Sequence, residues 1–376
     1  MQLKSLKIGD KIARLPIIQG GMGVGVSRSS LAGAVAAAGG VGIISTAQIG
    51  YDEEGFDKDP AGANLRAIKK HIVRAKELAK DTLGKCAGLV GVNVMVALKH
   101  YREHVRAAME AGADVVICGA GLPMDLPELV EGSETKISPI VSSARACKLI
   151  LKQWDKKYHR TADFIVVEGP AAGGHLGFHP EKLEEYGYMG DLDAAGEAAA
   201  HSLEHDEVDS EIRGVVEVKK EYEVKYGCHI PVIMAGGVFG HEDVEHAFLL
   251  GAEGVQVASR FVATYECDAS DAFKQAYLDA KDGDAVIIQS PVGLTGRAVH
   301  DAFVDETKAQ KCPITRCYQC LEKCDPSKVP YCITKALVDS VKGDTENGLV
   351  FCGANVGRIN HLMHVSDLMK ELAGEA

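Results

Sequence analysis

The sequence predicts an α/β protein, a (β/α)8 TIM barrel, from two observations. Eight short runs of apolar and β-branched residues recur along the chain, and segments with amphipathic helical spacing separate them. Most of the runs are continuously apolar, as expected of parallel strands that are buried on both faces. Eight such units over about 260 residues match this barrel in number and size. A doubly wound sheet is the main alternative, but no GxGxxG motif follows the first run.

The eight predicted strands alternate with helices in chain order. One predicted helix places Tyr101, Val105 and Ala108 on a single face, and a later one does the same with Val244 and Ala247. The strands are expected at residues 16–21, 40–46, 89–96, 114–121, 137–143, 163–169, 230–237 and 254–261.

The chain departs from this pattern in two places. The connection after strand six is long, acidic and alanine-rich, which predicts an insertion of solvated helix at about residues 180–227. After residue 300 a cysteine-rich stretch follows, and then an amphipathic helix that begins near Ser366. We therefore expect a barrel over residues 1–300, with residues 301–376 as a cysteine-rich segment and a C-terminal helix packed on it.

Composition narrows the class of protein. The 376 residues are 46% hydrophobic and carry a formal net charge of −12. This charge argues against nucleic acid or an anionic membrane as the main partner, because both require clustered cations. The N-terminus lacks the apolar core of a signal peptide, and no apolar run is long enough to span a membrane. A cytoplasmic location is expected, where disulfides are improbable and a dense cysteine group is more often metal-binding or catalytic.

The ends of the seventh and eighth strands predict a phosphate site. In barrels of this kind phosphate usually binds there, at the carboxyl face. Strand seven ends in AGG, and strand eight ends in ASRF. Glycine lets the backbone approach an anion, so Gly237 and Ser259 are the predicted phosphate contacts. The alternative is that these residues form only tight turns between strand and helix.

Strand six ends in EGPAAGGHLGF, residues 168–178. The glycine pair Gly173 and Gly174 predicts a backbone turn against something flat or bulky. His175 would then project at the barrel mouth, where an imidazole can transfer protons near neutral pH. A purely structural histidine is the alternative.

Two earlier strands also end in candidate site residues. Strand one is followed by Gly20, Gly21 and Met22, and strand three contains Asn93 as its only polar residue in GVNVMV. A buried amide needs hydrogen-bond partners, which a ligand with ring carbonyls and nitrogens would supply. Alternatively, Asn93 fixes the backbone of the barrel itself.

The motifs PIIQGGMGVGVS, GVNVMV, EGPAAGGHLG, PVIMAGGV and GVQVASRF together resemble the nitronate monooxygenase superfamily of FMN-dependent barrels. That superfamily includes the enoyl-ACP reductases called FabK. CGAGLP, SPVGLTGRAV and the cysteine loop ending in YCI are similar to the FabX-type acyl-ACP dehydrogenase/isomerases. Proteins of that type carry FMN and a [4Fe–4S] cluster, and ordinary nitronate monooxygenases and FabK enzymes lack the cysteine loop.

The resemblance implies that residues 1–300 bind FMN across the barrel mouth, with His175 as the base. It implies dehydrogenation of an acyl thioester on acyl carrier protein to the trans-2-enoyl form, followed by isomerisation to the cis-3 form. A homodimer is expected. The cofactor contacts carried over are Gly20, Gly21, Met22, Asn93, Glu168, Gly173, Gly174, Gly236, Gly237, Gln256, Ala258 and Ser259.

Five of the eleven cysteines lie between residues 312 and 332, spaced C-x4-C-x2-C-x3-C-x7-C. Four thiolates suit either zinc or an iron–sulfur cluster, but a structural zinc site would more often show two separated C-x2-C pairs. A tight trio followed by a later cysteine resembles a cluster site, as does the family pattern. The predicted ligands are Cys317, Cys320, Cys324 and Cys332; Cys312 is the spare cysteine and the alternative to Cys317.

Three rival functions remain open. The LTGRA motif, at residues 294–298, resembles the FabK pattern more closely than the FabX pattern. This resemblance implies NAD(P)H-dependent reduction of trans-2-enoyl-ACP. Oxidation of nitronates is a second rival. A redox-sensing or electron-transfer flavoprotein, which needs no base at His175, is the non-enzymatic rival.

Overall fold

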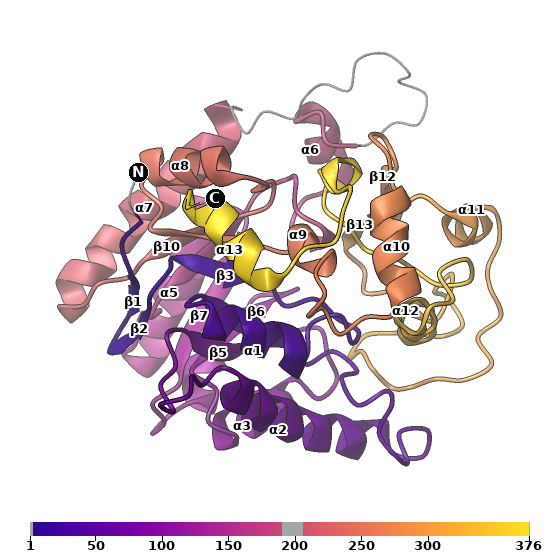
Figure 1. Cartoon of the computed structure of the whole chain (residues 1–376), viewed down its shortest axis with the longest axis horizontal. Coiled ribbons are helices and arrows are strands. Elements are labelled where there is room, and N and C mark those ends of the chain that lie inside the picture. Colours follow the sequence, from indigo (N-terminus) through magenta and orange to yellow (C-terminus); the bar gives the residue numbers. More distant parts are fainter. Residues whose placement is uncertain (1–2, 190–205, 376) are drawn as a thin grey trace.

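The computed structural model describes residues 3–189 and 206–375. Its centre is a closed barrel in which each strand pairs in parallel with its neighbours (Figure 1). The predicted (β/α)8 barrel is therefore confirmed, and the doubly wound alternative is wrong. The barrel strands are β3 (Ile17–Gln19), β4 (Val41–Ser45), β5 (Leu89–Met95), β6 (Val115–Gly119), β7 (Lys136–Val141), β8 (Ile165–Glu168), β10 (Val232–Ala235) and β11 (Gly254–Val257).

The barrel interior is filled by branched side chains such as Ile18, Ile43, Ile117 and Val166, all fully buried or nearly so. Strand residues that point outward form a second core with the surrounding helices. These helices are α1 (Ser29–Ala37), α2 (Pro60–Leu78), α3 (Tyr101–Glu110), α4 (Leu126–Leu129), α5 (Ala144–Tyr158), α7 (Asp206–Tyr226), α8 (His241–Leu249) and the short α9 (Ser259–Val262).

The predicted insertion differs in part from what the structure shows. Residues 190–205 lie outside the described residues. Before them is α6 (Pro180–Glu185), and after them α7 packs against α5 with Ile212, Val215 and Tyr222 buried. Because one face of α7 is in the core, it is the barrel helix of the sixth unit rather than solvated helix.

Two further elements pack on the barrel, an N-terminal hairpin that the sequence pattern does not indicate and the expected C-terminal helix. A hairpin of β1 (Leu6–Ile8) and β2 (Lys11–Ala13) buries Leu6 and Ile8 against the barrel interior. The C-terminal helix α13 (Val365–Ala373) packs against α1 and α8, and so completes the ring of helices (Figure 1). It begins at Val365, whose N–H donates to the Glu266 carboxylate at 3.0 Å.

The remaining chain forms a second layer around β9 (Gly174–Leu176), β12 (Ala285–Gln289) and β13 (Thr295–Val299). These strands form an antiparallel sheet in the order β12-β13-β9. Near it lie α10 (Asp271–Asp279), α11 (Ala302–Ala309), α12 (Ile333–Lys342) and the 3-10 turn Val356–Arg358 (Figure 1). Among the described residues, no helix is long and apolar enough to cross a membrane.

Candidate active site

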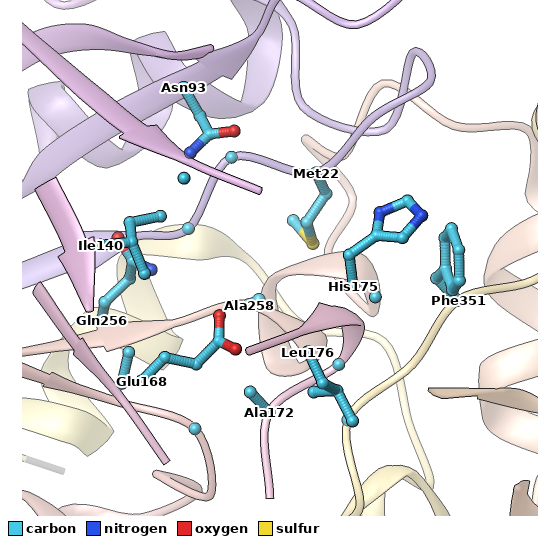
Figure 2. A pocket seen from close by; sticks show the side chains of 18 of the residues that line it. Met22, Asn93, Ile140, Glu168, Ala172, His175, Leu176, Gln256, Ala258 and Phe351 are labelled. Atoms are coloured by element: carbon cyan, nitrogen blue, oxygen red, sulfur yellow. The ribbon is translucent and has the colours of Figure 1, made fainter. Parts of the chain in front are cut away.

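A cavity of about 430 Å³ opens at the carboxyl ends of the barrel strands. Its size is in the range of roughly 300–1,000 Å³ that is usual for ligand pockets. All thirteen residues that the sequence singles out for the barrel mouth line this cavity, and Figure 2 shows several of them. They are Gly20, Gly21, Met22, Asn93, Glu168, Gly173, Gly174, His175, Gly236, Gly237, Gln256, Ala258 and Ser259.

The turn after β3 approaches β5 closely. A Cβ atom on Gly21 would lie 2.5 Å from Cβ of Asn93, so only glycine fits at this position. The N–H of Met22 donates to Oγ of Ser27 at 2.7 Å, which fixes the start of the turn. Met22 consequently extends into the cavity between Asn93 and His175 (Figure 2).

Two amide side chains face the cavity from opposite strands. Asn93 belongs to β5 and Gln256 to β11, and both line the cavity. No hydrogen bond within the described residues uses either side-chain amide. Partly buried amides normally have hydrogen-bond partners, and a ligand that offers donors and acceptors would supply the partners that these two side chains lack in the described part of the chain.

His175 lies on β9, at the edge of the cavity. Its Nε2 atom is 2.7 Å from Oγ of Ser290, and its ring meets that of Phe351 edge-on with centroids 4.9 Å apart. Figure 2 shows the two rings side by side. Burial lowers the pKa of His175 to about 4, so the imidazole is neutral at neutral pH. A neutral imidazole held in a fixed orientation can accept a proton from a bound substrate.

Glu168 ends β8, and its carboxylate points into the cavity (Figure 2). One of its oxygens accepts a hydrogen bond from the N–H of Gly177 at 3.2 Å. Burial nevertheless raises the pKa of Glu168 to about 7. This carboxyl group therefore changes charge near neutral pH, which is common for acidic groups in functional sites.

Arg297 supports the loop that carries these groups. The residue is only 1% exposed, and its guanidinium donates to backbone carbonyls on both sides of the glycine turn. The acceptors are the carbonyl oxygens of Pro170, Ala172 and Tyr188. The arginine of the LTGRA motif thus holds the connection between β8 and β9 from behind, without lining the cavity.

The predicted phosphate cradle lies at the ends of β10 and β11. Gly236 and Gly237 have φ values of +85° and +97°, a conformation that favours glycine. Their N–H groups donate to no atom in the described part of the chain, which leaves them available to an anion. Oγ of Ser259, however, already accepts the N–H of Gly353 at 2.9 Å. The Ser259 hydroxyl keeps its own hydrogen, so both this O–H and the backbone N–H at the start of α9 could donate to a phosphate.

A wall of the cavity comes from residues that sequence reasoning missed. Residues 348–355, here called the strap, cross the mouth and contribute Leu349, Phe351, Cys352, Gly353 and Asn355 to the lining. Cβ on Gly173 would lie 2.3 Å from the carbonyl oxygen of Cys352, so the glycine turn packs directly against the strap. No local periodicity marks these residues, and only the GANVG glycines hint at a close approach.

A second cavity, of about 180 Å³, lies under the cysteine-rich loop. All four predicted ligands, Cys317, Cys320, Cys324 and Cys332, line it, together with apolar residues such as Ile314 and Val329. Cys312 is not among the lining residues. The loop is anchored on the turn after β5, where the N–H of Lys99 donates to the carbonyl of Cys320 at 3.1 Å.

Within the described ranges, no three histidine, cysteine or acidic side chains converge closely enough to hold one metal ion. A zinc ion held by four cysteines needs four sulfur atoms each about 2.3 Å from a single point. Four of the cysteines instead line one partly open cavity.

Comparison with known proteins identifies relatives of this fold. The family described as nitronate monooxygenase matches residues 4–375 of the chain. A probable nitronate monooxygenase of Bacillus subtilis is 25% identical over 224 residues, which are 57% of this chain and 52% of the relative. One from Staphylococcus aureus strain Newman is 28% identical over 144 residues, 38% of this chain and 33% of the relative. The matches thus span about half or less of these relatives.

Two solved structures share the architecture. FabK from Thermotoga maritima has 24% identity and a TM-score of 0.66, covering 96% of this chain and 93% of that one. Nitroalkane oxidase from Streptomyces ansochromogenes has 20% identity and a TM-score of 0.67, covering 96% of both chains. At these identities the likeness concerns the fold alone.

Proposed function

Because the chain belongs to the nitronate monooxygenase family, we propose that it is an FMN-dependent oxidoreductase in which His175 transfers protons. One observation carries the proposal. The neutral imidazole, oriented by Ser290, faces the same cavity as the unpartnered amides of Asn93 and Gln256.

FMN fits the cavity by the chemistry of the residues that line it. The N–H groups of Gly236 and Gly237 would bind the phosphate, and Asn93 and Gln256 would recognise the polar edge of the ring. Met22 would contact the ring itself. When bound, FMN supplies a hydride acceptor, and the protein supplies orientation and electrostatics.

The proposed substrate is an acyl thioester on acyl carrier protein. Apolar side chains, among them Met95, Ile140, Leu176 and Leu294, line the cavity and suit an acyl chain. In the proposed reaction the β-carbon gives up a hydride and His175 accepts the proton from the α-carbon, which leaves a trans-2 double bond. Once His175 has released that proton to solvent, it can accept a proton from the γ-carbon and return it to the α-carbon, which moves the double bond to the cis-3 position.

We further propose that Cys317, Cys320, Cys324 and Cys332 hold a [4Fe–4S] cluster. The support for this assignment is that four cysteines, whose thiolates are soft ligands, line one cavity. Cys312 lies outside the lining and remains the spare cysteine.

A second candidate, NAD(P)H-dependent reduction of trans-2-enoyl-ACP, uses the same cavity in the opposite direction. The LTGRA motif, which forms much of β13 beside His175, favours it. Anaerobic product analysis with saturated and trans-2-enoyl-ACP, each with and without NADH, separates the two. We expect enoyl products from the saturated substrate without NADH.

Turnover of the enoyl substrate alone, and only with NADH, would identify a reductase instead. If only nitronates are oxidised, in air, the acyl-ACP assignment is wrong. If no substrate is turned over and the flavin merely cycles between redox states, the protein is an electron-transfer or sensing flavoprotein.

A further inference from the structure

Helix α12 connects the two cavities physically. Cys332, one of the four cysteines that line the smaller cavity, is the N-cap residue immediately before α12. Ile333, in its first turn, lines the same cavity. Farther along, Leu337 and Ser340 line the larger cavity. At about 1.5 Å per residue, the ten residues of α12 span about 15 Å.

The strap is attached to the same helix. The N–H of Leu349 donates to the carbonyl of Ala336 at 3.1 Å, and Oγ of Ser340 donates to the carbonyl of Leu349 at 2.8 Å. Gly348 packs directly on the helix, since a Cβ atom there would lie 2.5 Å from the backbone nitrogen of Ser340. The path of the strap therefore depends on where α12 lies.

From α12 the strap runs along one side of the predicted flavin site. It meets β13, the glycine turn after β8, the cradle after β10 and the start of α9. The hydrogen bonds are Cys352 N–H to Arg297 O at 3.1 Å, Ala354 N–H to Ala171 O at 3.1 Å, Asn355 Nδ2 to Gly237 O at 2.9 Å, and Gly353 N–H to Ser259 Oγ at 2.9 Å.

The beginning of α12 is held by packing rather than by a side-chain cap, since Ile333 and Thr334 in its first turn are buried. The side chain of Cys332, at the N-cap position, makes no hydrogen bond to the backbone N–H groups of the first turn. The preceding loop, residues 312–331, contains no helix or strand. Four bonds from these cysteines to one central group would fix the loop and the first turn of α12 together.

We infer that the cysteine cavity and the flavin cavity are thermodynamically coupled through α12 and the strap, so that filling the first strengthens FMN binding in the second. The inference rests on the proposed function, because it takes FMN and a thiolate-bound cluster as the two ligands. By linkage the coupling is reciprocal, and FMN strengthens retention of the cluster by the same factor. Coupled sites typically change each other's affinity by about 5- to 150-fold, and we expect about tenfold here.

The test measures FMN affinity rather than turnover. The protein is purified anaerobically, its iron, sulfide and FMN contents are determined, the flavin is removed, and the Kd of FMN is measured by fluorescence titration. Cys320→Ser/Cys324→Ser, which leaves every residue of the flavin cavity unchanged, should bind FMN about tenfold more weakly than the wild type. Cys312→Ser, in the same loop but outside the cavity, is the matched control and should bind FMN like the wild type.

Gly348→Ala tests the connection itself. The added methyl group would displace the strap from α12 without altering a lining residue of either cavity. It should retain iron and still weaken FMN binding. A chelator-treated wild-type sample, compared before and after iron removal, gives the same measurement if the double cysteine variant does not fold.

An unchanged FMN affinity in cluster-free protein, with iron and FMN both present in the wild type, would overturn the coupling and leave the proposed function standing. Absence of iron or of FMN from the wild type would instead refute the proposed cofactors, and the coupling with them. Slower loss of iron to a chelator when FMN is bound would support the reciprocal half of the inference.

Discussion

Nε2 of His175 lies 2.7 Å from Oγ of Ser290, and the N–H of Val292 donates to that same oxygen at 3.3 Å. A serine oxygen has two lone pairs, so it can accept from both nitrogens at once. We propose that Nε2 carries the hydrogen and donates it to Oγ, which leaves the lone pair of Nδ1 free to accept a proton. The opposite arrangement, in which the Ser290 hydroxyl donates to Nε2, would leave no free lone pair on the imidazole.

Ser290 is therefore expected to position His175. Ser290→Ala should lower kcat by about tenfold with little change in KM, because the imidazole loses its fixed tautomer while the acyl chain keeps its contacts. Ser290→Thr keeps the hydroxyl and should restore most of the rate. Steady-state kinetics of all three proteins check this. Equal losses in the Ala and Thr variants would show that only packing at this position matters.

The charge of Glu168 predicts a pH dependence of FMN binding. Its pKa is raised to about 7 by burial, and a bound dianionic phosphate and an enclosing ring would raise it further. FMN should therefore bind better when Glu168 is protonated, and its affinity should fall as the pH rises through about 7. Titrations at pH 6, 7 and 8 measure this trend.

Glu168→Gln is the control, because its amide is neutral throughout this range. The variant should show a much flatter dependence of FMN affinity on pH. A wild type and a Gln variant with the same slope would mean that another group is responsible.

Much of the fold could be predicted because its strands are buried on both faces. The structure places β5 and β11 within the predicted runs 89–96 and 254–261, and the residues of these two strands are apolar apart from Asn93 and Gln256. The site residues that follow these strands could be predicted for the same reason, since the carboxyl ends of the strands in a parallel barrel meet at one face. That the residues meet there is observed; that they bind FMN stays a prediction.

The residues that close the site could not be predicted in this way. Ser290 and Phe351 reach His175 from more than a hundred positions away in the chain, and neither lies in a periodic segment. The strap belongs to the segment after residue 300, yet its residues Phe351 and Asn355 line the same cavity as Gly20 of the barrel. Sequence spacing gives no signal for such returns of the chain.

Arg297 does not line the cavity, but we expect it to contribute to the stability of the fold. Arg297→Lys keeps the charge but loses the planar fork that serves three carbonyl groups. The free energy of unfolding should fall by about 2–4 kcal/mol, because buried carbonyls lose hydrogen bonds to a charged group. Urea denaturation measures the change. Arg213→Lys, at an exposed position on α7, should change stability by less than about 0.5 kcal/mol.

The cysteine assignment predicts that substitutions of different cysteines in the loop will differ sharply in their effect on iron content. Anaerobically purified protein should contain iron and acid-labile sulfide together with FMN. Cys320→Ser or Cys324→Ser should remove the cluster, since both side chains line the 180 Å³ cavity. Cys312→Ser should retain most of it. Elemental analysis decides the point: stoichiometric zinc without iron would refute the cluster, and equal iron loss in all three variants would make Cys312 a ligand.

The last prediction separates His175 from His179, four residues further on. His179 is exposed at the start of α6 and does not line the cavity, so the structure places only His175 within reach of a substrate there. His175→Ala should retain FMN and iron but lose turnover by about two to four orders of magnitude, the usual share of general acid–base catalysis. His179→Ala is the matched control and should reduce its flavin with acyl-ACP at a nearly normal rate.

The pH profile adds a second readout for the same residue. Because burial holds the pKa of His175 near 4, the imidazole stays neutral as the pH falls through 6.5. In the Glu168→Gln background, which removes the cavity's other titrating group, flavin reduction should therefore stay level between about pH 5 and pH 8. If the pKa of His175 were unperturbed, half of the imidazole would be protonated near pH 6.5, and the rate of flavin reduction would be halved there. Stopped-flow measurement of flavin absorbance in both variants decides the assignment. Loss of reduction in His179→Ala but not in His175→Ala would transfer the role to His179, and loss in neither would mean that the proton goes to a different group.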